Sequence, residues 1–290
     1  MSETVSPSVP RAMLWMVGAL LSFAAMAIAG RELSSELTLF QILFLRSAIC
    51  LCVLVPLAAR VGWDRLATPR PFVHLARNSV HYAASYFWML GVISIPLAEV
   101  FAIEFTTPIW TAILAALFLR EPLTRVRLAA IALGFIGVMV ILRPGAAIVH
   151  PAAIAVLAAA LGYAAAYVFT KSLSAVDRPI VILFWMNVIQ LVIGLAPSAL
   201  TWVTPSPALW PWVAVIGISG LASHYCIARA MAFADATVVV PLDFLRLPLI
   251  AVVGFFFYAE PFDPFVLAGA VLVVGGNMLN LFSGRFSRKS

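Results

Sequence analysis

Long apolar stretches alternate with short polar joints along almost the whole chain, and the joints often contain Pro, Gly or Arg. A helix needs about 20 apolar residues to cross the hydrocarbon core of a bilayer. The pattern therefore predicts an all-α integral membrane protein with ten transmembrane helices, preceded by an N-terminal tail (1–12) and followed by a C-terminal tail (284–290). The predicted spans are residues 13–30, 39–59, 74–93, 97–119, 126–143, 152–173, 179–200, 211–233, 236–258 and 264–283.

The basic residues test this count, because cytoplasmic loops of membrane proteins carry an excess of Lys and Arg. If the N-terminus is cytoplasmic, thirteen of the eighteen Lys and Arg residues lie on the cytoplasmic side of the ten spans. Two lie on the far side, Arg31 and Arg143, and three lie within spans, Arg46, Arg229 and Arg246. The distribution predicts that both termini are cytoplasmic.

Composition agrees with a membrane protein. The chain is 64% apolar and 10% charged, whereas a soluble domain is about 45–50% apolar and about 25% charged. The net charge of +6 follows from the one-sided distribution of basic residues, so no nucleic-acid partner is expected. Cys50, Cys52 and Cys226 lie in apolar stretches without metal-ligand spacing, so we expect neither a metal site nor a cofactor.

Two stretches of the chain match each other about 139 residues apart. Each begins with a carboxylate inside an apolar stretch and ends with Glu-Pro at its edge. The first contains Glu104-Phe105, Pro108 and Glu121-Pro122; the second contains Asp243-Phe244, Pro248 and Glu260-Pro261. Five spans in each half is an odd number, so residues 13–143 and 151–283 are predicted to form two five-helix repeats of inverted orientation. Folds of this kind place a transport site at the membrane midplane, where the repeats meet.

These features resemble a known family. Ten spans in two repeats, an arginine in the second span (Arg46), and the sequences Phe-Leu-Arg-Glu-Pro-Leu-Thr (118–124) and Gly-Phe-Ile-Gly-Val (134–138) resemble the EamA-type transporters of the drug/metabolite transporter superfamily. The segment 70–77, which opens the third span, is similar to a branch that includes S-adenosylmethionine and riboflavin permeases. The resemblance implies a multi-pass carrier of the bacterial inner (plasma) membrane, with a central cavity between its halves, that works by alternating access.

Ionisable residues within the spans are the first candidates for function, because each costs at least about 2.5–3.5 kcal/mol near the bilayer centre. Glu104 and Asp243 lie at the same depth of equivalent spans and can hold a proton or a cationic group. The alternative is an ion pair or hydrogen bond that only fixes packing. Arg246 lies one turn after Asp243, so the two can neutralise each other or hold the two ends of a zwitterion.

Further candidates are polar or aromatic side chains near these charges. Arg46 and Asn187 occupy equivalent positions of the two halves, either as a cavity wall or as substrate contacts. His81 and His224 can relay protons, although a lone histidine in a helix bundle commonly serves packing. The full set of predicted substrate or coupling residues is Glu104, Asp243, Arg246, Arg46, Asn187, His81, Tyr86, Trp110, Trp185, His224, Tyr225 and Arg229, with Pro108, Pro241 and Pro248 as predicted hinges or kinks.

The sequence favours a secondary transporter over an enzyme. Its substrate would be a small polar or amphipathic metabolite that is amino-acid-like, S-adenosylmethionine-like or vitamin-like. Proton coupling, exchange and a homodimer all stay open. The chain has no nucleotide-binding loop, and its polar residues are spread over both halves, which suits a transport path. The alternative, an integral-membrane enzyme acting on a lipid or small molecule, lacks support from any His-Glu-x-x-His motif or serine nucleophile elbow.

Overall fold

The computed structural model describes residues 8–119, 124–144 and 149–286, and these fold into a bundle of α-helices. Glu121 and Pro122, which close the first of the two matching stretches, lie outside the described residues. The first six helices are α1 (Val9–Leu33), α2 (Leu39–Val61), α3 (Pro71–Ser94), α4 (Leu97–Glu104), α5 (Thr107–Leu119) and α6 (Arg125–Leu142). The next six are α7 (Pro151–Leu173), α8 (Pro179–Leu200), α9 (Trp210–Phe233), α10 (Ala236–Asp243), α11 (Arg246–Tyr258) and α12 (Pro264–Phe286).

The helices confirm the prediction of an all-α, multi-pass membrane protein. Within the described ranges, nine segments are long and apolar enough to cross a membrane, counting α4–α5 and α10–α11 as one segment each. The remaining long helix, α3, is less apolar because it carries His74, Arg77, Asn78 and His81. Its polar side chains His74, Arg77 and Asn78 are buried inside the bundle.

Many large apolar side chains point outward from the bundle, as expected for a surface that faces lipid. A water-soluble protein rarely exposes a continuous apolar surface of this kind. More than two thirds of the residue surface is exposed in Leu14, Phe72, Leu117, Phe118, Leu200, Phe256, Phe257 and Val271.

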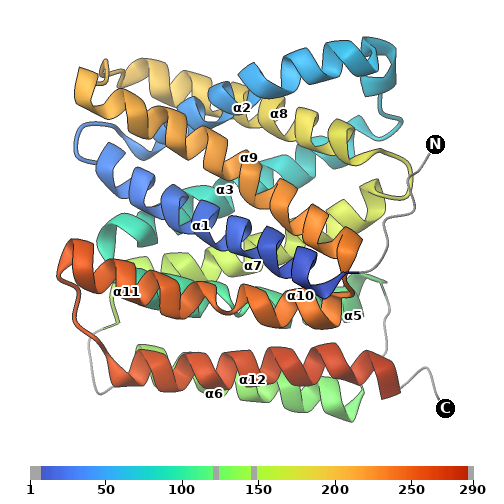
Figure 1. Cartoon of the computed structure of the whole chain (residues 1–290), viewed down its shortest axis with the longest axis vertical. Helices are drawn as coiled ribbons and strands as arrows, with labels where there is room; N and C mark the ends of the chain where they lie inside the picture. Colours follow the sequence, from blue (N-terminus) through green and yellow to red (C-terminus); the bar gives the residue numbers. More distant parts are fainter. Residues whose placement is uncertain (1–7, 120–123, 145–148, 287–290) are drawn as a thin grey trace.

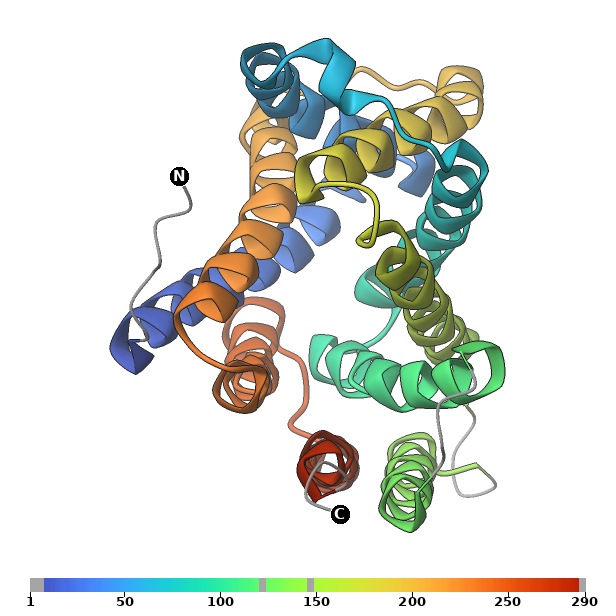
Figure 2. The same ribbon diagram turned by 90° about the vertical axis from the view of Figure 1, so that its right-hand side faces the viewer.

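Helices from the two halves of the chain pack against each other throughout the bundle. The most extensive contacts join α1 to α9, α3 to α7, α2 to α8 and α6 to α12. Figure 1 shows that α1 begins and α12 ends at the same end of the bundle. In Figures 1 and 2, α6 and α12 form a pair at one edge of the bundle.

Glycines allow α6 and α12 to approach closely. A Cβ atom added at Gly137 would lie 2.7 Å from the backbone oxygen of Gly269, and one added at Gly276 would lie 2.7 Å from the backbone oxygen of Ala130. Small residues that let backbones meet in this way are typical of helix contacts in membranes.

Two of the predicted spans are broken in the middle, at equivalent places. The residues 97–119 form α4 and α5, which are separated at Phe105 and Thr106, and the residues 236–258 form α10 and α11, which are separated at Phe244 and Leu245. Pro108 is the second residue of α5 and Pro248 the third of α11, so each lies in a first turn, where no backbone donor is needed. Pro108 and Pro248 therefore lie at the start of a new helix and not at a bend within a continuous one.

The backbone oxygens freed by the first break are satisfied by side chains. The hydroxyl of Thr106 donates to the oxygen of Ile103 at 2.7 Å, and the hydroxyl of Thr107 donates to the oxygen of Glu104 at 2.6 Å. Asn277 of α12 donates from Nδ2 to the oxygen of Phe105 at 2.7 Å. Broken helices are tolerated at membrane depth only where such partners or a cavity accept the free backbone groups.

Candidate functional site

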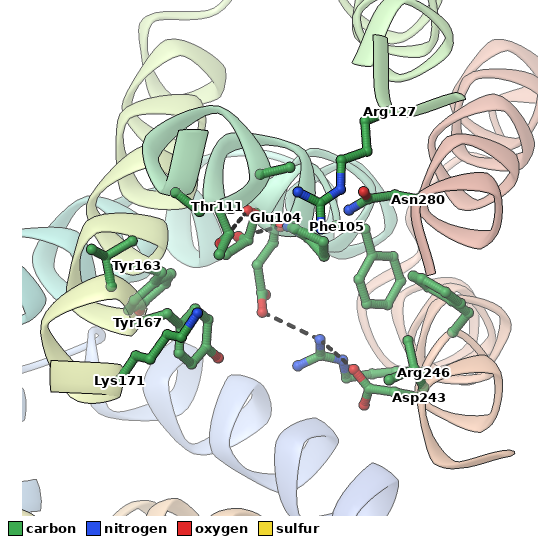
Figure 3. Close-up of a pocket in the computed structure, with 17 residues that line it drawn as sticks. Glu104, Phe105, Thr111, Arg127, Tyr163, Tyr167, Lys171, Asp243, Arg246 and Asn280 are labelled. Atoms are coloured by element: carbon green, nitrogen blue, oxygen red, sulfur yellow. Dashed lines mark hydrogen bonds and ion pairs between the residues drawn. The ribbon is translucent and has the colours of Figure 1, made fainter. Parts of the chain in front are cut away.

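The two helix breaks line one central cavity of about 460 Å³. Glu104 comes from the end of α4, Asp243 from the end of α10 and Arg246 from the start of α11 (Figure 3). Tyr163 and Tyr167 line the cavity from α7. It extends toward the end of the bundle where α7 ends, and there its lining includes Arg127, Lys171 and Asn280.

Arg246 connects the two carboxylates. Its Nη2 lies 3.3 Å from Oε1 of Glu104 and 3.4 Å from Oδ2 of Asp243. The second oxygen of Glu104 accepts a hydrogen bond from Nε1 of Trp88 at 2.7 Å. We call Glu104, Asp243 and Arg246 the acid–arginine cluster. It joins α4 of the first half to α10 and α11 of the second, and it carries a formal charge of −1 when both acids are ionised.

Aromatic rings surround the guanidinium of Arg246. Its central carbon lies 4.2 Å from the ring centre of Phe23 and 4.9 Å from that of Phe105. Cation–π contacts of this kind stabilise a desolvated guanidinium. Even so, Nε of Arg246 and Oδ1 of Asp243 are buried without a hydrogen-bond partner among the described residues. Buried polar atoms of this kind are rare unless water or a ligand satisfies them.

A second part of the cavity, of about 130 Å³, continues from the cluster toward α2, α8 and α9. We call it the inner chamber, and the 460 Å³ part the outer chamber. Both are lined by Glu104, Asp243, Arg246, Tyr163 and Tyr167. The inner chamber is also lined by Arg46, His81, Ser85, Trp88, Asn187, Gln190 and His224.

Hydrogen bonds fix the polar groups of the inner chamber. Nη2 of Arg46 donates to Oε1 of Gln190 at 3.0 Å, and Nε2 of Gln190 lies 2.8 Å from Nδ1 of His81. A guanidinium has only donors, so the amide oxygen of Gln190 faces Arg46 and its NH2 group donates to His81. Nδ1 of His81 therefore accepts, which makes the imidazole neutral with its proton on Nε2. Asn187 bonds back to the oxygen of Leu183 at 2.9 Å.

Eight predicted site or hinge residues line the central cavity: Glu104, Asp243, Arg246, Arg46, Asn187, His81, His224 and Pro108. Five predicted site residues lie outside both chambers. Tyr86 packs on Phe40, Trp110 on Phe135 and Tyr225 on Trp15; Trp185 donates to the oxygen of Leu66 at 2.9 Å; Arg229 lies over the rings of Trp15 and Phe233. The two other predicted hinges, Pro241 in α10 and Pro248 in α11, also lie outside the chambers.

Several cavity residues were not among those predicted. Ser85 and Trp88 follow His81 by four and seven residues, so they share its helix face. Tyr163 and Tyr167 are likewise one turn apart on α7. The helical spacing from His81 gives a signal for Ser85 and Trp88, whereas α7 has no charged residue within its central part to mark which face points inward. Within the described residues, no three His, Cys, Asp or Glu side chains are grouped as potential metal ligands.

The end of the bundle opposite Lys171 is closed by polar contacts around Arg31. This guanidinium pairs with Glu260 and donates to the backbone oxygens of Val92 at 2.7 Å and Ile95 at 2.8 Å. Glu260 also accepts from the backbone N–H of Leu97 at 2.9 Å. We call this contact the Arg31–Glu260 clasp. It ties the end of α1 to the α3–α4 joint and to the α11–α12 joint.

Two further contacts lie at the same end of the bundle. The hydroxyl of Tyr258 donates to Glu32 at 2.9 Å, and Arg143 pairs with Asp263 at 2.5 Å. Each joins one half of the chain to the other.

The EamA-like transporter family matches the chain twice, over residues 10–143 and 150–282. The S-adenosylmethionine uptake transporter of Rickettsia felis is 28% identical over 277 residues, covering 95% of this chain and 94% of that protein. The riboflavin transporter of Rhizobium johnstonii is 29% identical over 269 residues, covering 91% and 89%. The pseudopaline exporter of Pseudomonas aeruginosa is 26% identical over 257 residues, covering 87% and 89%.

The fold also resembles that of a protein whose crystal structure has been solved; the two chains superpose with a TM-score of 0.64 and share 19% sequence identity. The match covers 96% of this chain and 99% of that one.

Proposed function

Because the chain belongs to the EamA-like transporter family, we propose that it is a secondary transporter that carries a small polar or amphipathic metabolite across the bacterial inner membrane by alternating access. The observation that carries the proposal is the acid–arginine cluster. Helices from both halves break at the middle of the bundle and bring Glu104 within 3.3 Å of Arg246 on the wall of one cavity. Transporters use such discontinuous helices to build sites at the midplane.

The two halves are proposed to be inverted repeats with cytoplasmic termini. In support, the helix breaks recur at a constant spacing of 139 residues, and the family matches the chain twice in tandem. The basic residues favour this orientation. The start of α6 and the end of α7 both carry basic side chains, and both lie at the end of the bundle that we assign to the cytoplasm. In this orientation the outer chamber extends toward the cytoplasm, and the clasp closes the far side. The conformation is therefore an inward-facing one.

The acid–arginine cluster favours a cationic group on the substrate, and the aromatic walls of the cavity favour a flat ring. The acid–arginine cluster has one more carboxylate than it has guanidinium groups, which attracts a cation. Tyr163 and Tyr167 line both chambers, and aromatic walls stack on flat rings. The names of the relatives, which are transporters of S-adenosylmethionine and riboflavin, agree with a nitrogen-rich, partly aromatic metabolite.

Uptake by sealed proteoliposomes tests this function. The probes are S-adenosylmethionine, riboflavin and several amino acids, each with and without an inward proton gradient. Wild-type protein is expected to take up one class of probe saturably. Glu104→Gln keeps the size of the side chain and an acceptor for Trp88 but removes a charge, so its uptake should fall at least about tenfold. Asp64→Asn, a matched change at an exposed position, should leave uptake unchanged.

The outcomes separate the alternatives. If Glu104→Gln loses only the effect of the gradient, Glu104 carries the coupling proton. Absence of saturable uptake for every probe would contradict the proposed substrate class. Recovery of a chemically altered probe from the lumen, measured by mass spectrometry, would favour the membrane enzyme.

A further inference from the structure

We propose that Arg46 forms an anion subsite in the inner chamber, which binds the carboxylate of an amino-acid head group while Glu104 and Asp243 hold its amine. This inference rests on the proposed function and specifies its substrate as a zwitterion. It begins from Arg46, an in-span arginine of the cavity that forms no ion pair in the described part of the chain.

The partners of Arg46 and of Arg246 differ. Arg246 lies within 3.4 Å of two carboxylates. Among the residues that the structure describes, Arg46 forms no ion pair, and its hydrogen bond goes to the neutral amide of Gln190 at 3.0 Å. Its side chain is partly exposed to the inner chamber. An arginine at membrane depth normally pairs with an anion or faces water, so an incoming carboxylate meets a guanidinium with unused donors.

The inner chamber is lined by charges of both signs, carried by different helices. The acid–arginine cluster has a formal charge of −1, and Arg46 of α2, which donates to Gln190, adds +1. His81 is neutral, because Nδ1 accepts from Gln190. The formal charges that line the chamber then cancel. A zwitterion satisfies both the cluster and Arg46, whereas a simple cation leaves Arg46 unpaired and a simple anion leaves the excess negative charge of the cluster unpaired.

The sizes of the two chambers agree with this assignment. A volume of about 130 Å³ accommodates an amino-acid head group, and the adjoining 460 Å³ accommodates the rest of a metabolite. Pockets for drug-sized ligands measure about 300–1,000 Å³. The head group would thus enter first, past Tyr163 and Tyr167, which line both chambers.

The test compares a probe that has the carboxylate with one that lacks it. S-adenosylmethionine and decarboxylated S-adenosylmethionine share the amine, the sulfonium and the adenosine and differ in the carboxylate. Wild-type protein in proteoliposomes should take up the first with an apparent affinity about 10- to 100-fold higher. Arg46→Gln should lower the affinity for S-adenosylmethionine to that for the decarboxylated probe and leave the latter unchanged. Arg46→Lys should restore part of the discrimination.

Two further variants separate a binding role from a packing role. Gln190→Glu places a carboxylate against Arg46, which would strengthen a purely structural contact but compete with the substrate. It should therefore abolish the discrimination. Arg60→Gln removes the same charge from the exposed last turn of the same helix and should leave the discrimination at its wild-type value.

Chemical labelling gives a readout that does not depend on transport. Phenylglyoxal modifies arginine, and mass spectrometry locates the product. S-adenosylmethionine should protect Arg46, and the decarboxylated probe should not. Two outcomes overturn the subsite and leave the proposed function intact. One is uptake of S-adenosylmethionine while Arg46 is labelled equally with either probe present. The other is discrimination between the probes that survives in Arg46→Gln or Gln190→Glu. Absence of both uptake and protection with S-adenosylmethionine also overturns the subsite, whereas the proposed function is overturned only if riboflavin and the amino acids are not taken up either.

Discussion

In the proposed orientation, the Arg31–Glu260 clasp determines how strongly the far side of the membrane is closed. Its side chains are only 15% and 12% exposed, so the pair lies between an exposed pair, worth about 0–1 kcal/mol, and a buried pair, whose disruption costs about 3–5 kcal/mol. Glu260→Gln removes the charge and keeps an acceptor for the backbone of Leu97. We therefore expect Glu260→Gln to destabilise the closed state relative to the open state by about 1–3 kcal/mol. This change corresponds to an increase of about 5- to 150-fold in the ratio of open to closed molecules.

Cysteine labelling measures this ratio. Cys50, Cys52 and Cys226 are first replaced, and Leu97, which is fully buried beside Glu260 at the closed end, is changed to cysteine. A membrane-impermeant maleimide is then added from the far side. While opening is fast relative to labelling, the labelling rate follows the population of the open state, so Glu260→Gln should raise the rate by the same 5- to 150-fold factor.

A second acid at the same end provides the matched control. Asp263→Asn breaks the Arg143–Asp263 pair, whose side chains are 35% and 28% exposed. Because solvent screens this pair, we expect an increase below about fivefold. Equal labelling rates in wild type and Glu260→Gln, or a larger effect of Asp263→Asn, would refute the reasoning that the clasp holds the far side closed.

Three other changes test the site and its scaffold. Trp88→Phe removes the hydrogen bond to Glu104 and should lower uptake about 5- to 20-fold without changing the protein's elution in size-exclusion chromatography. Asn277→Leu leaves the backbone oxygen of Phe105 without its donor and should destabilise the fold by about 1–3 kcal/mol, measured as a lower melting temperature in detergent. Gly137→Val would place a side chain against the backbone of α12 and should lower the melting temperature further; an unchanged value would contradict the close packing of α6 with α12.

The sequence predicts the helices well because each needs a long apolar stretch, and that requirement is visible without any tertiary contact. The breaks at 105–106 and 244–245 were not predicted. Pro108 and Pro248 indicate a disturbed helix, but the apolar pattern predicts one continuous span around each of them. What ends α4 is the set of partners for its free carbonyls, and one of these, Asn277, lies 172 residues away in the sequence.

The cavity was predicted in part, for a reason specific to membranes. Lipid is as apolar as the protein interior, so hydrophobic periodicity does not reveal which face of a helix points inward. Polar residues such as Arg46, His81 and Asn187 reveal the inward face, and they line the inner chamber. Aromatic residues carry no such signal. The sequence therefore predicts Trp185 as a cavity residue, whereas its side chain donates to the backbone oxygen of Leu66 outside both chambers and Tyr167 of α7 lines the cavity.

The division of the acid–arginine cluster between the two halves has a consequence for the energetics of the transport cycle. Arg246 shares a segment with Asp243, whereas Glu104 belongs to the other half. In a carrier whose halves separate at this place, the guanidinium stays with Asp243, and Glu104 becomes an ion without a counter-charge, which costs several kcal/mol in a dry interior. A carrier that changes conformation without a bound substrate would bear that cost in full. A bound substrate cation or a proton on Glu104 would remove it, so a cycle of the proposed alternating-access kind would favour obligatory exchange or proton-coupled return over the return of an unloaded carrier.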